Sequence, residues 1–168
     1  MTDGNSPETG LSLTDDYLAK LFDTTFEFND RPAPIPADIR ADWRVPLLML
    51  IVNSCRGRRA SLQQVQAIAA AAIFEESRGA FLGSFEGEAD PAALLIRYDP
   101  AVTRAANLAV GLDLLSWQNR SRLGLTTKGE AMLEAILADG DAFVEERSFL
   151  SDLGGKIPMS SISRMLEP

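Results

Sequence analysis

The stretch that decides the fold is DPAVTRAANLAVGLDLLSWQNRSRLGLTTKGE, residues 99–130. Its first two residues, Asp99 and Pro100, predict the start of a helix, because the carboxylate caps the first turn and proline is tolerated at the first helical position. We expect this helix over residues 100–110, with Gly111 near its end. The spacing of apolar side chains predicts that its inward-facing residues are Val102, Ala105, Ala109 and Leu112.

The same stretch continues as a β-hairpin. Residues 114–118 are strand-like, and residues 122–126 alternate between apolar and polar side chains. Between them, Asn119-Arg120-Ser121 is typical of a turn. The three pieces together predict two antiparallel strands.

Further helices are expected after the hairpin. Thr127, with Glu130 three residues later, predicts the N-cap of a helix that ends at Gly140. Another helix is expected over residues 141–150. After Pro158, a short last helix is expected to carry three apolar residues, Ile162, Met165 and Leu166.

Before the deciding stretch, the sequence predicts a central buried helix. Asp42 is the expected N-cap, and Pro46 is tolerated in the first turn, where its missing N–H has no partner to lose. The helix is expected to run to about Cys55 and to be apolar on nearly every side. The polar stretch Arg56-Gly57-Arg58-Arg59 then ends it.

A second helix follows, capped by Ser61. Gln64 stands three residues later, which completes a capping-box pattern. The helix is expected to run to about Phe74. Its apolar stripe is predicted to consist of Leu62, Val65, Ile68, Ala69 and Ala72.

Residues 75–98 separate this helix from the one at Pro100. Gly79, Gly83, Gly87 and Pro91 punctuate the stretch, and one or two short helices are expected near residues 78–85. Residues 94–98 predict a short strand.

Three helices, a β-hairpin and another helix form the winged helix-turn-helix arrangement, and the string from Tyr98 to Ile136 resembles that family. The resemblance implies a mainly α fold with a small β-wing. It departs from the family at the second and third helices, which are separated here by about 25 residues instead of a short turn. The expected organisation is an N-terminal segment (1–43), a winged-helix core (44–138) with an insertion at about 75–98, and a helical extension (139–168).

A narrower resemblance rests on three strings: DWRVPLL at 42–48, CRGRRASL at 55–62 and RYDP at 97–100. They are similar to a family of bacterial middle components, small proteins encoded between a large ABC-type ATPase and an effector in three-component antiphage systems. The resemblance implies an accessory subunit with that ATPase as its partner. It carries no catalytic residue over to this chain.

The net charge of −8 argues against a protein that coats nucleic acid through bulk electrostatics. The charge is unevenly distributed, because residues 44–129 carry ten basic and seven acidic side chains, while both flanking segments are acidic. A nucleic-acid site, if the chain has one, is therefore expected in the centre.

DNA contact by a winged helix places the helix over 100–110 in a groove and uses the hairpin as the wing. The candidate DNA-contact residues are Arg56, Arg58, Arg59, Thr103, Arg104, Asn107, Gln118, Asn119, Arg120 and Arg122. Against this hypothesis, the helix is rich in alanine and carries one basic residue, so these side chains also fit an ordinary solvated surface on a fold used for protein contact. Both interpretations stay open.

The residues favour neither an enzyme nor a membrane protein. The chain has no histidine, and its single cysteine, Cys55, is expected to be packed at the end of the central helix. We therefore expect no catalytic residue, no metal site and no cofactor. The longest apolar runs have eight residues, far short of the roughly 20 needed for a membrane span, and the N-terminus lacks a signal-peptide pattern, which predicts a cytoplasmic protein.

A dense apolar set lies before the proline-rich stretch at 31–36, and it either packs on the chain's own core or docks on another subunit. The candidate partner-docking residues are Tyr17, Leu18, Leu21, Phe22, Phe26 and Phe28, with Ile162, Met165 and Leu166 at the other end. Homo-oligomerisation is left open. The sequence thus predicts a non-enzymatic adaptor in a larger, DNA-associated complex, and the alternative is a free-standing DNA-binding transcriptional regulator.

Overall fold

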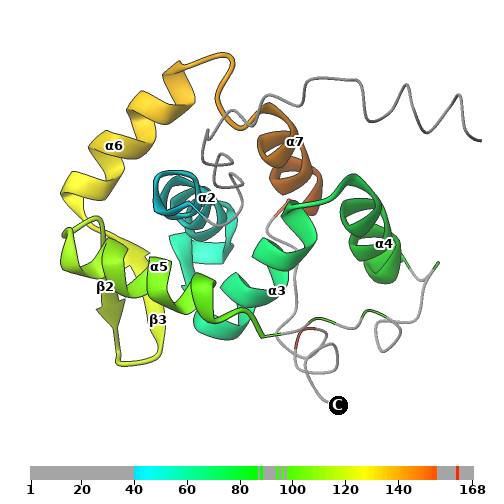
Figure 1. Ribbon diagram of the computed structural model, residues 1–168, viewed down its shortest axis with the longest axis horizontal. Helices are drawn as coiled ribbons and strands as arrows, with labels where there is room; N and C mark the ends of the chain where they lie inside the picture. Colours follow the sequence, from blue (N-terminus) through cyan, green and yellow to red (C-terminus); the bar gives the residue numbers. More distant parts are fainter. Residues whose placement is uncertain are drawn as a thin grey trace, which may run out of the picture. The chain divides into compact units, whose positions relative to one another are not determined.

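The computed structural model describes residues 40–86, 88, 94, 96, 98–154 and 162, all of which belong to the second of the two units of the chain, Ile35–Pro168. It is mainly helical with a small three-stranded antiparallel sheet (Figure 1). In chain order the elements are α2 (Ala41–Ser54), the 3-10 helix η2 (Arg56–Arg58), β1 (Arg59–Ser61), α3 (Leu62–Ala72), α4 (Glu75–Glu86), α5 (Pro100–Gly111), β2 (Leu115–Gln118), β3 (Arg122–Leu125), α6 (Thr127–Ala138) and α7 (Val144–Leu153).

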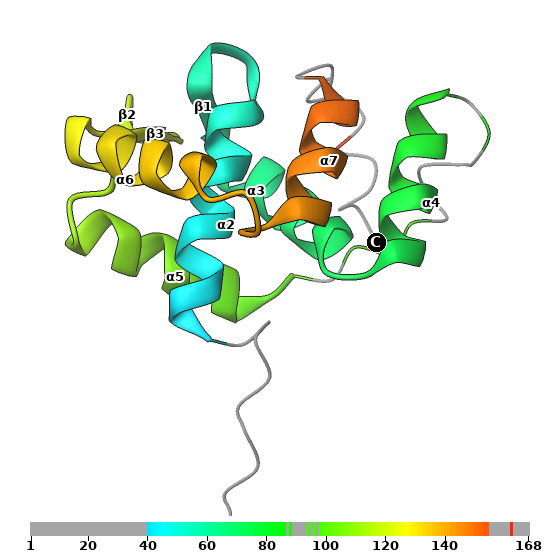
Figure 2. The ribbon, with the colours of Figure 1, turned by 90° about the horizontal axis from the view of Figure 1, so that it is seen from above.

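Helix α2 is the centre of the core, as predicted. Every residue from Arg44 to Val52 is buried, because α3, α5, α6, α7 and the sheet pack around it (Figures 1 and 2). The predicted N-cap is wrong: Arg40 occupies that position, and Asp42 lies within the first turn, where its carboxylate pairs with Arg40. Residues 41–43, expected in the N-terminal segment, therefore already belong to α2.

The capping box of α3 is confirmed. The Ser61 hydroxyl accepts a hydrogen bond from the Gln64 N–H at 3.1 Å, and the Ser61 N–H donates to Gln64 Oε1 at 2.8 Å. The helix ends at Ala72, two residues before the predicted end. Along its predicted stripe, Val65, Ile68, Ala69 and Ala72 are buried, while Leu62 is half-buried.

The sheet contains the predicted hairpin and one strand that was not predicted. β2 pairs with β3 in register Gln118↔Arg122, and the turn between them has left-handed backbone at Asn119 (φ 49°) and Arg120 (φ 59°). β1, at the far edge, pairs with β3 in register Ser61↔Arg122, so the strand order is β1-β3-β2. One face of the sheet packs on the core through side chains that include Ala60, Leu115 and Leu123.

Helix α5 begins as predicted. Asp99 is the N-cap, with its Oδ1 accepting from the Ala101 N–H at 2.7 Å, and Pro100 opens the first turn. Val102, Ala105 and Ala109 are buried as expected. Leu112 is not: it is the C-cap that follows the last helical residue, Gly111, and it is 46% exposed.

The helices after the hairpin are shifted from their predicted positions. α6 is capped by Thr126 instead of Thr127, because the Thr126 hydroxyl accepts from the Gly129 N–H at 3.0 Å. Gly129 packs so closely on the segment between α5 and β2 that a Cβ there would lie 2.0 Å from the Leu114 carbonyl oxygen. The helix expected over 141–150 begins instead at Val144, as α7.

The described part of the insertion contains the helix α4, which is longer than the predicted short helices near 78–85. It packs on α3 and α7, away from the hairpin (Figures 1 and 2). The strand expected at 94–98 is not confirmed: of its described residues, Leu94, Ile96 and Tyr98, none lies in a strand. Instead, the Ile96 N–H bonds to the Leu94 carbonyl in a tight turn.

Candidate functional site

The position of α5 is fixed by polar contacts at Asp99. The side chain of Gln66, on α3, binds both backbone groups of Asp99. Gln66 Nε2 donates to the Asp99 carbonyl and the Asp99 N–H donates to Gln66 Oε1, both at 3.0 Å. From α2, Arg44 Nη1 lies 2.7 Å from Asp99 Oδ2. One residue thus receives contacts from both helices that α5 packs against, which fixes where α5 begins and which side it exposes.

The exposed side of α5 is more apolar than that of a groove-reading helix. Arg104 and Asn107 are exposed, as predicted for contact residues. Leu108 and Leu112 are exposed too, at 42% and 46%. Because residues four apart on a helix lie above one another, Arg104, Leu108 and Leu112 form one stripe, here called the α5 stripe.

Two of the predicted contact residues are held by the chain itself. Thr103 Oγ1 accepts from Gln66 Nε2 at 3.2 Å and shares a hydrogen bond of 2.6 Å with the Tyr98 hydroxyl. Arg58 Nη1 lies 3.0 Å from Glu130 Oε1 on α6, and Arg58 Nε donates to Asn53 Oδ1 at 3.0 Å. Both side chains therefore serve internal contacts.

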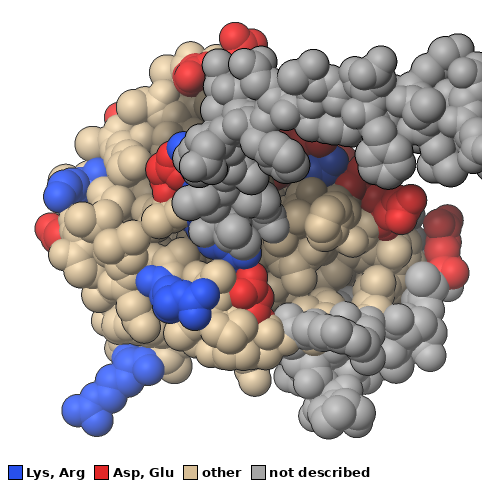
Figure 3. Space-filling model, viewed as in Figure 1, with Lys and Arg blue, Asp and Glu red and all other residues tan. Residues whose placement is uncertain are grey.

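The remaining predicted contact residues fall into two groups. Asn119 and Arg120 are exposed at the tip of the hairpin, which extends beyond α5 in Figure 1. Arg59 and Arg122 are exposed on the outward face of the sheet, opposite to the buried Ala60 and Leu123. The face of the molecule that carries α5 shows few, scattered Lys and Arg side chains over its described surface (Figure 3).

On the outward face of the sheet, Gln118 lies across Gly124. A Cβ at Gly124 would come within 2.3 Å of Gln118 Nε2, so glycine makes room for this side chain. The Gln118 Oε1 atom is buried and accepts no hydrogen bond from the part of the chain that the structure describes. Arg56 is exposed in η2, just before β1.

The predicted partner-docking residues receive little structural support. Ile162 is completely buried in the hydrophobic core, so it is not available to a partner, and that prediction is wrong for this residue. The others, Tyr17, Leu18, Leu21, Phe22, Phe26, Phe28, Met165 and Leu166, lie outside the described residues.

Cys55 is buried at the end of α2, where burial raises the pKa of its thiol to about 11. A thiol of that pKa stays protonated at neutral pH and is a poor nucleophile. Within the described ranges, no group of three or more acidic or cysteine side chains is placed to hold a metal ion, and no helix has the length and apolarity to cross a membrane.

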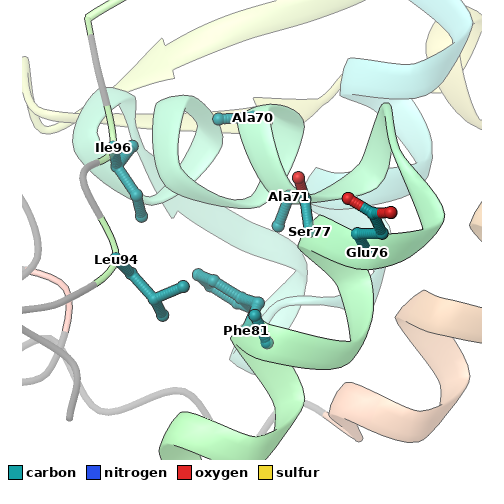
Figure 4. Close-up of a pocket in the computed structure, with 8 residues that line it drawn as sticks. Ala70, Ala71, Glu76, Ser77, Phe81, Leu94 and Ile96 are labelled. Atoms are coloured by element: carbon teal, nitrogen blue, oxygen red, sulfur yellow. The ribbon is translucent and has the colours of Figure 1, made fainter. Parts of the chain in front are cut away.

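A pocket of about 310 Å³ lies between α3, α4 and the segment at Leu94 and Ile96 (Figure 4). Leu94 and Phe81 point toward one another across it, and Glu76 lies at its other end. Sequence reasoning missed this pocket, because Leu94 and Ile96 were assigned to a strand. Its lining is mostly apolar, and the polar lining residues are Glu76 and Ser77 on α4.

Comparisons with known proteins add no relative. No family model matches the chain significantly, and neither does any curated protein or solved structure. Function must therefore be argued from the surfaces just described.

Proposed function

We propose that this chain is a non-enzymatic adaptor subunit with a winged-helix core, and that it contacts a protein partner through the α5 stripe. The element order around the sheet, α2, β1, α3, α5, β2, β3, with strand order β1-β3-β2, is compatible with a winged helix. In this interpretation α5 is the third helix of the winged helix. Helix α4 is an insertion that packs on α3 and α7.

The observation that carries the proposal is the exposure of Leu108 and Leu112 at 42% and 46%. Fully burying a leucine is worth about 1.5–3 kcal/mol, so covering the exposed part of each is worth roughly 1 kcal/mol. Base edges are read by hydrogen bonds, whereas the centre of a protein interface is apolar. The α5 stripe, with two leucines and one arginine, fits a protein better than a DNA groove.

The partner we propose is a large ABC-type ATPase, which is what the resemblance of residues 42–48, 55–62 and 97–100 to antiphage middle components implies. The buried, protonated thiol of Cys55 and the mostly apolar pocket beside Phe81 support a role without chemistry of its own. The chain would then act as an adaptor that joins larger subunits of the complex.

The test first asks whether a large ABC-type ATPase is encoded beside the chain's gene. That ATPase is then co-expressed with the chain, and the affinity is measured on the purified pair. Leu108→Asn together with Leu112→Asn should weaken binding about 30-fold, since roughly 2 kcal/mol of apolar burial is lost. Leu137→Asn is the matched control, because Leu137 is a similarly exposed leucine (39%) on α6. Equal binding by the double variant and the wild type would exclude the α5 stripe as the contact.

The alternative function, a DNA-binding transcriptional regulator, is favoured by Arg104 and Asn107 on α5 together with Asn119 and Arg120 at the hairpin tip, all exposed. A regulator prefers its own site over unrelated DNA by about 10³-fold or more. A search for a preferred sequence among random duplexes distinguishes the two functions. Enrichment of one site, lost on Arg104→Ala, would favour the regulator.

A further inference from the structure

The two segments that form the sheet contain no acidic residue in an otherwise acidic chain, and Glu130, directly after the second segment, pairs with Arg58. Residues 53–74 and 114–129 contain all three strands and none of the 24 Asp and Glu residues. They hold six of the 16 Lys and Arg residues: Arg56, Arg58, Arg59, Arg120, Arg122 and Lys128. A polyanion that approaches this protein is therefore repelled by most of the chain and attracted at the sheet.

The register places two unpaired arginines side by side on the outward face. Arg59 pairs with Gly124, and Arg122 lies two residues before Gly124 on the neighbouring strand. Such diagonal neighbours are roughly 7–8 Å apart, within reach of long side chains. Neither arginine forms an ion pair or side-chain hydrogen bond with any described residue. Two exposed like charges at this separation repel each other weakly in water, and an anion bound between them would turn that repulsion into attraction.

The array continues along the strands. Arg56 precedes β1 at one end, and Arg120 lies beyond Arg122 at the hairpin tip; both are exposed and likewise unpaired within the described ranges. Arg58 does not belong to this array, because its guanidinium group forms an ion pair with Glu130. Four free guanidinium groups thus follow one another along the length of the sheet, which matches a linear polyanion better than a compact one.

The rest of the outward face is polar. The register brings Ser116 beside Gly124 and Gln118 beside Arg122, and the apolar residues of the strands, Trp117 among them, lie on the other face. Interfaces with proteins have an apolar centre, whereas interfaces with nucleic acid are polar and positively charged. Guanidinium groups also bind phosphate through two parallel hydrogen bonds.

We propose that the outward face of the β1-β3-β2 sheet binds the sugar–phosphate backbone of a nucleic acid, without reading its sequence. The site differs from the α5 stripe and does not depend on whether α5 contacts a protein. With both surfaces in use, the chain holds a protein partner on α5 and a nucleic acid on its sheet.

The experiment is fluorescence anisotropy of a labelled mixed-sequence duplex of about 20 base pairs, titrated with the full chain across a salt series. Each neutralised phosphate contributes about −0.9 to the slope of log K against log salt, so four arginines predict a slope near −3.6. Arg59→Gln and Arg122→Gln should each make the salt dependence less steep, with a slope of about −2.7. Arg104→Gln is the matched control, since Arg104 on α5 is also exposed and has no ion-pair or side-chain hydrogen-bond partner among the described residues, and it should leave the slope unchanged.

A second pair of variants adds a charge instead of removing one. Ser116→Glu places a carboxylate on β2, in the same cross-strand row as Gly124 and Arg59, and should abolish binding, whereas Ser148→Glu, on the exposed surface of α7, should not. Circular dichroism melting verifies that all variants fold. An unrelated duplex should bind as well as the first, and a single strand should bind with a shallower slope of about −0.7 per phosphate.

Several outcomes would overturn the proposal. Equal loss of binding in the Arg104 and Arg122 variants would place the site elsewhere. Polyglutamate that binds while nucleic acid does not would identify an acidic protein segment as the ligand. No change in anisotropy at low salt, up to about 10⁻⁴ M protein, the weak limit for non-specific binding, would leave the sheet without a nucleic-acid role.

Discussion

Replacing Asp99 by Asn should destabilise the protein strongly, because it leaves the buried charge of Arg44 without an ion-pair partner. The Arg44 side chain is only 6% exposed, and Asp99 is its ion-pair partner at 2.7 Å. Its Nε atom already lacks a hydrogen-bond partner among the described residues. Removing one partner of a buried ion pair costs about 3–5 kcal/mol. Since Asp99 itself is 35% exposed and water can reach the pair, we expect the lower end, about 3 kcal/mol.

The converse change is expected to be mild. Arg44→Met removes the buried charge and leaves the Asp99 carboxylate in contact with water and with the first turn of α5, at a cost of roughly 1 kcal/mol. The double variant should resemble Arg44→Met, which gives a coupling free energy of about 2–3 kcal/mol. Asn keeps an oxygen that can accept from the Ala101 N–H, so loss of the helix cap does not confuse the comparison.

The assay is urea unfolding followed by circular dichroism, with thermal melting beside it. For a chain of this size, a loss of about 3 kcal/mol corresponds to a fall in Tm of roughly 6–12 °C. The reasoning is refuted if Asp99→Asn costs less than about 1 kcal/mol, or if the double variant is as unstable as Asp99→Asn alone.

Two further changes test local features. Thr126→Ala should cost about 1–2 kcal/mol, because it removes the N-cap of α6, while Thr127→Ala should be nearly neutral, and equal effects in urea unfolding would contradict the assigned cap. Cys55 should react with iodoacetamide at about pH 8 roughly 100-fold more slowly in the folded chain than in urea, because burial raises its pKa from 9.0 to about 11; rapid labelling of the folded chain would contradict this burial. Since the unfolded thiol loses its proton first, folded stability should fall as pH rises from 9.0 to about 11, by up to roughly 3 kcal/mol, and Cys55→Ala should lack this part of the pH dependence.

The sequence predicts those parts of the fold whose signals are local. Asp99-Pro100 and the Ser61/Gln64 pair start α5 and α3 as expected, because a cap needs only the residues within one turn. The hairpin was predictable because its turn and both strands are adjacent. The central position of α2 followed from its unbroken apolar surface.

What sequence reasoning missed depends on distant partners. β1 has a length of three residues and lies within an arginine-rich stretch. It is a strand only because it pairs with β3. Leu94 and Ile96 have a strand-like pattern but line the pocket with Phe81 instead. Thr126 and Thr127 both suit a cap, and the packing of Gly129 on Leu114 decides between them.

The candidate site was predicted as a set of residue types without a geometry. Most of its residues are exposed, but the structure separates them between α5, the hairpin tip and the outward sheet face. Thr103 and Arg58 could not be excluded from sequence, since their partners, Gln66 and Glu130, lie on other helices. The exposed Leu112 was misassigned because its burial depends on what packs over the end of α5, and helical spacing alone does not show that.

The hydrogen bonds between Gln66 and Asp99 also affect how this fold can accommodate insertions between α3 and α5. The chain leaves α3 at Ala72 and returns at Asp99, where the side chain of a residue from the same α3 holds it by both backbone groups. The excursion between them is thus a closed loop, and lengthening such a loop adds little entropic cost, about 0.6 kcal/mol for each doubling. Its length and content can vary while α5 keeps its place. The segment carrying α4 is therefore a position where new structure can be added to the protein without disturbing the surfaces that α5 and the sheet present.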